Sequence, residues 1–198
     1  MRQSIRRLAL ALPLAPWLAL ALWVALALPW VRDALERVMV LHMLVQIPLL
    51  AICGVLVATA LPVGVRARIA EWNSGGITGT LVAVIVSSWW MVPRALDWVL
   101  ASPAMEALKF VSLPLLVGIP IALSWRALGF IGRGFVIANV LPMWAVAGWL
   151  YLAAPVRVCN YYLVSQQATA GAGLLWLSSL VGVAICVSAF RPSWATSA

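Results

Sequence analysis

The sequence predicts an all-α fold: a polytopic transmembrane helical bundle of about six membrane-spanning helices, in one integral membrane domain that covers residues 1–198. Composition is the first indication. Hydrophobic residues make up 65% of the chain, charged residues only 9%, and the mean hydropathy is +1.07. A soluble domain of this size needs far more charge to cover its surface. The pattern is the second indication, because the apolar residues form continuous runs of about 20, the length that crosses a bilayer core about 30 Å thick.

The apolar runs place the spans in chain order. Each run must be helical, because a backbone that faces lipid has to satisfy its hydrogen bonds within its own segment. The strands of a membrane barrel would instead alternate over about ten residues. Prolines inside several runs predict bends, and the connections are too short to form a soluble domain. The predicted spans are residues 8–29, 38–61, 77–100, 103–125, 134–156 and 172–190.

The first run has a second interpretation, as a signal peptide. Residues 1–7 are basic, and Ala25-Leu26-Ala27 has the small-residue spacing of a cleavage site. The apolar run is about 20 residues, however, which is longer than the roughly 7–15 of a signal sequence. We therefore expect a retained first helix, which Pro13 and Pro16 bend near its cytoplasmic end.

The distribution of arginine sets the predicted orientation. Eight arginines and one acid fall on one side of the spans, whereas five basic and four acidic residues fall near the other. The positive-inside rule then places both termini in the cytoplasm, and we expect a multi-pass protein of the bacterial inner (plasma) membrane. The pI of 10.8 reflects this basic face, so nucleic-acid binding is not expected. The arginines of the cytoplasmic side are Arg2, Arg6, Arg7, Arg66, Arg68, Arg126, Arg133 and Arg191.

A histidine and two methionines share one face near the outer end of the second span. Met39, His42, Met43 and Gln46 follow the i, i+3, i+4, i+7 spacing of a helix face. The plainest interpretation is packing, with the histidine bonded to a backbone carbonyl and the methionines filling gaps. A metal site is the alternative, because imidazole and thioether groups suit Cu(I).

Other sulfur side chains fall on the same predicted side of the membrane. Met91 lies in the outer half of the third span, Met105 at the outer start of the fourth, and Cys159 in the last external connection. The candidate Cu(I) ligands are therefore Met39, His42, Met43 and Met91, with Met105 and Cys159 as outer contributors.

Four charged residues border the turn between the third and fourth spans. Arg94 and Asp97 stand three positions apart, as do Glu106 and Lys109, so each pair shares a helix face. We expect the four charges to meet in a salt-bridge cluster at the external surface that closes the hairpin. The alternative is a docking site for an ion or a partner.

Several classes of site are excluded by what the sequence lacks. The three cysteines have no CxxC spacing, so they predict neither a disulfide framework nor a zinc site. His42 is the only histidine, which excludes a haem with two histidine ligands from this chain. There is no phosphate-binding loop and no nucleophile–base pair, so we do not expect an enzyme. A transporter is disfavoured because no inverted repeat and no charge deep in a span is evident.

The order of short motifs resembles the CtaG-type cytochrome oxidase assembly factors, polytopic proteins with a His-Met-x-x-His helix, a Trp-His-x-Pro motif, a Glu-His pair and an Asp-Gln…Ala-Gly segment. The likeness spans about residues 37–176. The matching segments are His42-Met43-Leu44-Val45-Gln46, Trp90-Met91-Val92-Pro93, Glu106-Ala107, and Ser165-Gln166-Gln167 with Ala170-Gly171.

The departures from this pattern bear on the implied function. Gln46, Met91 and Ala107 stand where the family has histidines, and Ser165 replaces its aspartate. The resemblance implies a non-enzymatic factor for assembly of a copper-containing respiratory or oxidative complex, handling Cu(I) at the external face. The alternative is a structural accessory subunit of a membrane enzyme without a metal of its own.

We also expect the second, third and fourth spans to form the core, with His42 facing the third span and not lipid. An imidazole without a partner in hydrocarbon would cost several kcal/mol.

Overall fold

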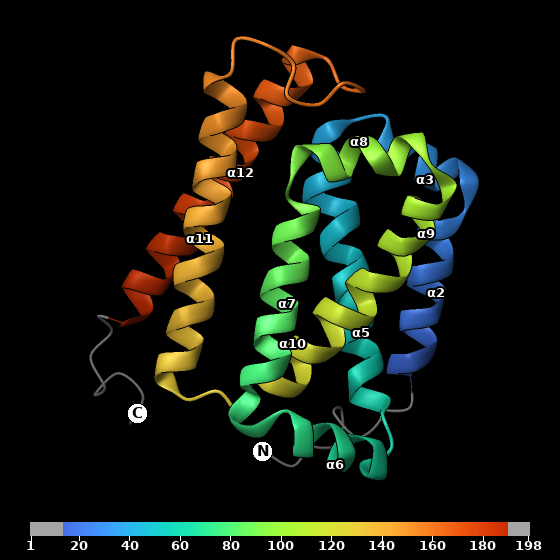
Figure 1. The fold of residues 1–198 in the computed structure, drawn as a ribbon, viewed down its shortest axis with the longest axis vertical. Coiled ribbons are helices and arrows are strands. Elements are labelled where there is room, and N and C mark those ends of the chain that lie inside the picture. The colour runs from blue at the N-terminus through green and yellow to red at the C-terminus, as the bar shows by residue number, and fades with distance from the viewer. Residues whose placement is uncertain (1–13, 190–198) are drawn as a thin grey trace.

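The protein is an all-α helical bundle, which confirms the predicted fold class (Figure 1). The computed structural model describes residues 14–189. Within that range 4 helices are long and apolar enough to cross a membrane, and two bent helix pairs bring the number up to 6 if each pair is one span. The protein is therefore a membrane protein. Residues 8–13 of the first predicted span, Phe190 of the last, and the outermost arginines lie outside the described residues.

The first predicted span is a helix that breaks at a proline. Helix α2 (Ala15–Ala27) carries Pro16 in its first turn, and α3 (Pro29–Glu36) follows at an angle of 70°. Leu28 between them is extended, with ψ 130°, because the residue before a proline avoids helical geometry. Helix α3 occupies a segment that the sequence pattern assigned to a connection.

The second and fourth predicted spans correspond to helical stretches whose bounds lie within one residue of the predicted ones. Both are 22 residues long, and both contain a π-helical stretch close to prolines. A proline offers no N–H to the preceding turn, and the wider π turn keeps the helix continuous. The two spans comprise α4 (Met39–Leu41), η1 (His42–Gln46) and α5 (Ile47–Ala60), and α9 (Pro103–Ser112), η3 (Leu113–Gly118) and α10 (Ile119–Ser124).

The third predicted span, residues 77–100, consists of two helices. Helix α7 (Ile77–Trp90) ends ten residues early, and α8 (Pro93–Ala101) lies across the end of the bundle (Figure 1). Val92 is extended, with ψ 128°, because Pro93 follows it. Before α7, helix α6 (Val63–Trp72) has no buried residue. It forms the second bent pair, at 69°, with the stretch that comprises η2 (Ser74–Gly76) and α7.

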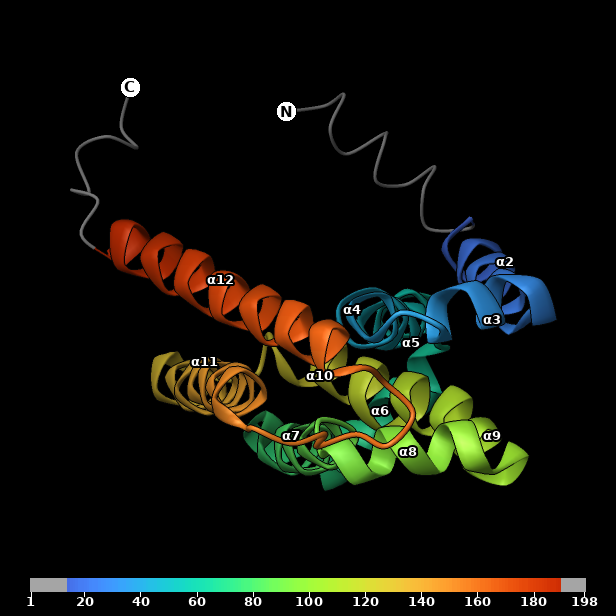
Figure 2. The same cartoon turned by 90° about the horizontal axis from the view of Figure 1, so that it is seen from above.

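The last two helices form a pair at the side of the bundle (Figures 1 and 2). Helix α11 (Phe130–Ala153) begins four residues before its predicted start and α12 (Val164–Ala189) eight before. In their most apolar stretches 11% and 17% of the residues are buried, against 39% in residues 39–60 and 103–124. Most of this pair's surface therefore faces the surroundings. The pair contacts the rest of the bundle where α12 meets α4 and η1 and where α11 meets α7.

The charged residues separate to two ends of the bundle. We call the end that carries α3, α8 and the 154–163 connection the α3–α8 end, and the opposite one the α6 end. The predicted external residues Arg32, Arg94 and Arg157 lie in the elements of the former, and Arg66 and Arg68 in α6 itself. The structure keeps the two predicted charge sets apart, and the assignment of the α6 end to the cytoplasm remains a prediction.

Candidate functional site

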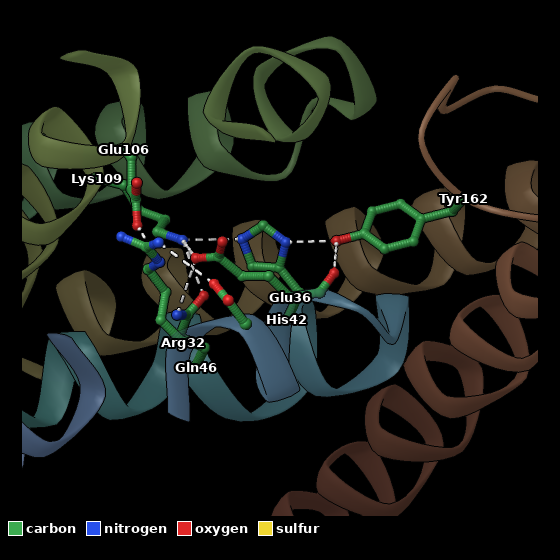
Figure 3. Close-up of polar contacts among 8 residues, drawn as sticks. Arg32, Glu36, His42, Gln46, Glu106, Lys109 and Tyr162 are labelled. Carbon is green, nitrogen blue, oxygen red and sulfur yellow. Dashed lines mark hydrogen bonds and ion pairs between the residues drawn. The ribbon is translucent and has the colours of Figure 1, made fainter. Parts of the chain in front are cut away.

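The ammonium group of Lys109 is at the centre of a buried polar network near the α3–α8 end (Figure 3). Lys109 is fully buried, and its Nζ donates to Glu36 Oε1 at 2.6 Å, to Gln46 Oε1 at 2.9 Å and to His42 Nε2 at 3.2 Å. An ammonium has three N–H donors, and each of them has one acceptor here. The charge of Lys109 is thus balanced by one carboxylate and solvated by two neutral groups.

Three segments bring these groups together. Glu36 is the last residue of α3, and His42 and Gln46 are the first and last residues of η1, one turn apart. Lys109 belongs to the inward stripe of α9, where Ser112 and Leu113 at i+3 and i+4 are also buried. The stripe is the helix period that normally carries apolar residues to a core, so it places the lysine inside the protein.

The hydrogen-bond pattern fixes the tautomer of His42. A lysine can only donate, so Nε2 accepts and Nδ1 carries the proton. Nδ1 then donates to the Tyr162 hydroxyl at 2.7 Å, and that hydroxyl donates to the Glu36 carbonyl oxygen at 2.8 Å. Burial raises the pKa of Tyr162 above its usual range, so the phenol keeps the proton that it donates. Gln46 Nε2 completes the network by donating to Glu36 Oε1 at 3.1 Å.

The predicted cluster of Arg94, Asp97, Glu106 and Lys109 does not form. Glu106 and Lys109 pair with helix α3 instead: Arg32 Nε lies 2.9 Å from Glu106 Oε1, one turn from the Glu36–Lys109 pair. The physical reason is that α3 offers a basic and an acidic residue four positions apart, in the order that complements α9. The prediction treated α3 as a loop and so had no partner helix.

Asp97 holds the 154–163 connection against α8. Its carboxylate accepts hydrogen bonds from the backbone N–H and the side-chain amide of Asn160, at 2.9 and 3.1 Å, and from Tyr161 N at 3.4 Å. Gln167 of α12 secures the same connection, because its Oε1 accepts from Val158 N at 2.8 Å and its Nε2 donates to the Tyr151 carbonyl at 3.1 Å. These contacts bring Tyr162 to His42.

The sulfur side chains that were predicted as copper ligands gather in one apolar core. Met39, Met43 and Cys159 are buried in it, and Met91 and Met105 pack against it with part of their surface exposed. Cys159 Sγ lies 3.7 Å from the Pro93 carbonyl oxygen, and burial, aided by Asp97, raises the pKa of its thiol to about 12.

The hydrogen bonds of His42 are made with oxygen and nitrogen partners and not with sulfur. Both ring nitrogens of His42 are bonded, to Tyr162 and to Lys109. The prediction that His42 avoids lipid is confirmed, although its polar partners come from α9 and the 154–163 connection rather than from the third span. Among residues 14–189, no three His, Cys, Asp or Glu side chains converge as metal ligands.

A pocket of about 460 Å³ opens beside the network at the α3–α8 end. Glu36 and Tyr162 line its inner side, and its charged lining comprises three carboxylates and two guanidinium groups. The network therefore lies between the apolar core and a polar surface pocket. The charged lining residues are Arg32, Asp33, Glu36, Arg37 and Glu106.

Glu36, Lys109 and Tyr162 were missed as members of one site. One signal was available for Lys109, namely a lysine on the same helix face as Ser112 and Leu113 in an apolar run. No signal was available for Tyr162, because its contact with His42 spans 120 positions.

The segments that carry the family resemblance, or residues next to them in the chain, contact one another in the structure. His42 contacts Lys109, next to the Glu106 segment, and the fully buried Trp90 donates its Nε1–H to Ser112 Oγ at 3.0 Å. Gln167 is fastened to the connection that carries Tyr162. Comparisons of the chain with protein-family models, with curated proteins and with solved structures found no match.

Proposed function

We propose that this chain is a non-enzymatic, multi-pass protein of the bacterial inner membrane that serves the assembly of a larger membrane complex or remains in it as an accessory subunit, without a metal ion on His42. A respiratory oxidase is the leading partner class, which the resemblance to CtaG-type factors suggests. Lipid is the solvent for the remaining surface.

The observation that carries this proposal is the closure of the polar network. The only histidine of the chain has both ring nitrogens bonded, and every N–H of Lys109 has an acceptor. The imidazole therefore has no free ring nitrogen to activate a nucleophile. A copper ion on His42 Nε2 would have to share the lone pair that points at an ammonium 3.2 Å away, where the repulsion between two unit charges is about 5 kcal/mol at an effective dielectric constant of 20.

Native membranes test the proposal. The tagged full chain, solubilised in mild detergent, is expected to co-purify with a membrane complex in a fixed ratio. A factor that acts only in assembly would be found with partly assembled complex, and its deletion would lower the amount of mature complex. An accessory subunit would be found in the mature complex. A chain that purifies alone, and whose deletion leaves the membrane complexes unchanged, contradicts both roles.

Matched variants at three exposed tryptophan positions locate the contact. Trp149 and Trp176 lie on α11 and α12 with 64% and 70% of their surfaces exposed, and Trp17 on α2 is exposed to a similar 69%. A photo-crosslinking residue at each position should give a partner adduct from the α11–α12 pair, whose surface is the most open, and lipid adducts alone from position 17. The opposite distribution would move the contact to α2.

Cu(I) handling by the sulfur side chains is a second candidate function. The specific observation in its favour is that Met39, Met43 and Cys159 lie in the same buried core, with Met91 and Met105 against it. Soft thioether and thiol ligands favour Cu(I) over Zn²⁺. In this form of the proposal His42 is not a ligand, because its nitrogens are engaged.

Anaerobic copper titration with a reductant separates the two candidates. If sulfur binds Cu(I), the substitutions Met43→Leu and Met91→Leu should each weaken binding, and His42→Ala should not. Equal weak binding by all of these proteins would remove the copper candidate and leave the assembly or accessory role intact. Loss of binding on His42→Ala would restore the original ligand set and contradict the closed network.

A further inference from the structure

We infer that Glu36, His42 and Gln46 form a metal-type cation site whose resident cation is the Lys109 ammonium, and that a borderline divalent metal ion takes the same place when this ammonium is removed. The inference concerns the site itself and does not depend on the proposed assembly or accessory role.

The first argument is the convergence of the acceptors. A carboxylate oxygen, an imidazole nitrogen and an amide oxygen, from two segments of the chain, all lie within 3.2 Å of the same point, the Nζ atom. A lysine in an ordinary ion pair needs a single carboxylate. Here all three donors of the cation are met inside the protein, and His42 and Gln46 are themselves fully buried.

The second argument is that the acceptors are held in place from behind, as metal ligands are. His42 Nδ1 is bonded to Tyr162, which fixes the ring and the tautomer that leaves Nε2 free to accept. Gln46 Nε2 donates to Glu36 Oε1, which turns the amide oxygen toward the cation. Such outer contacts orient the ligands of metal sites and raise their basicity.

The chemistry of the acceptors selects the class of metal. Imidazole nitrogen and carboxylate oxygen are ordinary ligands of Zn²⁺ and of Co²⁺, its spectroscopic substitute, and an amide oxygen can fill a third position. No sulfur atom is among the acceptors of Lys109, so Cu(I) is not the expected ion here. The polar pocket of about 460 Å³ that Glu36 lines provides a route from the surface.

The ammonium and the metal exclude one another, because they use the same three acceptors. In the wild-type protein the ammonium of Lys109 occupies the site, so we expect little metal binding there. In the variant Lys109→Leu the aliphatic stem is largely kept, while the position of the Nζ atom becomes vacant. The carboxylate of Glu36 then lacks its cation, and a divalent ion from solution can replace it.

The test is a Co²⁺ titration of the full chain in detergent, followed by the visible absorption of the bound ion. Wild type should bind weakly, and Lys109→Leu should take up about one Co²⁺ per chain. Adding His42→Ala to Lys109→Leu should weaken that binding by about 100-fold or more, since it removes the nitrogen ligand. The matched control Lys109→Leu with Met91→Leu should bind as Lys109→Leu does, because it alters only the sulfur core.

Two results with these variants would overturn the inference. One is a folded Lys109→Leu protein that binds Co²⁺ no better than wild type does. The other is Co²⁺ binding by Lys109→Leu that the added His42→Ala substitution does not change. If Lys109→Leu does not fold without metal, the double variant Glu36→His with Lys109→Leu takes its place in the Co²⁺ titration. This variant has no unpaired buried charge, and it presents two imidazoles to the metal ion. Failure of that folded protein to bind Co²⁺ would equally overturn the inference.

The outcome is distinguishable from a failure of the proposed function. The partner experiments use the wild-type chain in native membranes, whereas the Co²⁺ experiments use purified variants. A metal-free wild type with no partner would contradict the assembly or accessory role and leave the cation site standing.

Discussion

The carboxylate of Glu36 and the ammonium of Lys109 lie 2.6 Å apart, although 73 positions separate them in the chain. Glu36 ends a short surface helix, and Lys109 is fully buried in a membrane-spanning one. Their contact joins α3 to α9 and keeps a full positive charge inside the bundle.

Removing one partner of this pair should lower the free energy of unfolding far more than removing both. Lys109→Leu, studied with a chelator present, leaves the Glu36 carboxylate buried without a cation and should lower the free energy of unfolding by about 3–5 kcal/mol. The double variant Glu36→Gln with Lys109→Leu should recover most of that loss. Reversible unfolding in mixed micelles measures both. Arg32→Leu is the matched control, because its pair with Glu106 is partly exposed and should be worth about 1 kcal/mol or less. Equal losses in the single and double variants would mean that the pair is not coupled.

Close backbone contact between α5 and η3 predicts intolerance to a single methyl group. A Cβ atom on Gly54 would collide with the Pro114 carbonyl, and one on Gly118 with the Ala51 carbonyl. Gly54→Ala and Gly118→Ala should each lower the free energy of unfolding by about 1–3 kcal/mol, because backbone atoms cannot move aside as side chains do. Gly64 in the exposed helix α6 has open space around it. Gly64→Ala should therefore be neutral or stabilising, and a loss equal to that of Gly54→Ala would contradict the packing.

The bonds that Asp97 accepts should protect Cys159 from alkylation. In a chain with Cys53→Ser and Cys186→Ser, Cys159 is the only thiol, and it is fully buried. Asp97→Asn turns an acceptor into a partial donor facing the N–H groups of the connection. Losing a hydrogen bond to a charged group costs about 1.5–3 kcal/mol, so iodoacetamide labelling through local opening should accelerate by about 10–100-fold.

A control variant makes that labelling result specific. Asp33→Asn changes a carboxylate whose side chain is 50% exposed and which contacts only its neighbour Arg32. It should leave the labelling rate of Cys159 unchanged. Equal acceleration in both variants would show that the rate follows net charge and not the anchoring of the connection.

Cys159 should also make the protein less stable in alkali. Burial raises the pKa of its thiol to about 12 from an ordinary value of 9.0. Below pH 9 both folded and unfolded chains keep the proton, so the thiol has no effect on the pH dependence. Between about pH 9 and 12 the unfolded chain releases the proton and the folded chain does not, so the stability falls by up to about 1.4 kcal/mol per pH unit. The variant Cys159→Ala should therefore lose less stability than wild type over that range.

The two ends of the bundle should face opposite sides of the membrane. Reporter fusions after Arg157, in the 154–163 connection, and at Ala198 should report the outside and the cytoplasm, respectively, since α12 lies between them. Fusions in α6, at Arg68, should agree with Ala198. A common location for Arg157 and Ala198 would refute the orientation, although not the fold.

The sequence pattern was sufficient where a helix runs straight through an apolar stretch. Residues 38–61 and 103–125 were placed within one residue of α4–α5 and α9–α10, because length and composition alone decide such spans. The pattern failed at Val92, inside the predicted third span, where the chain stays apolar while a proline at the next position breaks the helix. It also assigned helix α3, which follows the break at Leu28, to a connection. Hydropathy does not distinguish a bent apolar segment from a straight one.

The candidate site was predictable only in part. The i, i+4 spacing of His42 and Gln46 correctly put both on one buried face. Their partners depended on α3, a helix that carries three charged residues and so does not register as a span. Lys109 was placed at the surface because lysine is rarely fully buried. Such a residue becomes tolerable only when a carboxylate and further acceptors surround it, which is information held by the tertiary structure.

The positions of the network residues in the chain also set the order in which they are synthesised and reach the membrane. Its members run from Glu36 to Tyr162, so the nascent chain delivers the acid first, the histidine next, the lysine much later and the tyrosine almost last. Glu36, His42 and Gln46 are therefore already synthesised when α9 leaves the insertion machinery and can bind Lys109 at once. In a chain without α3, the lysine would enter lipid with no counter-charge. Early synthesis of the acidic segment thus protects the insertion of a helix that would be costly to insert alone.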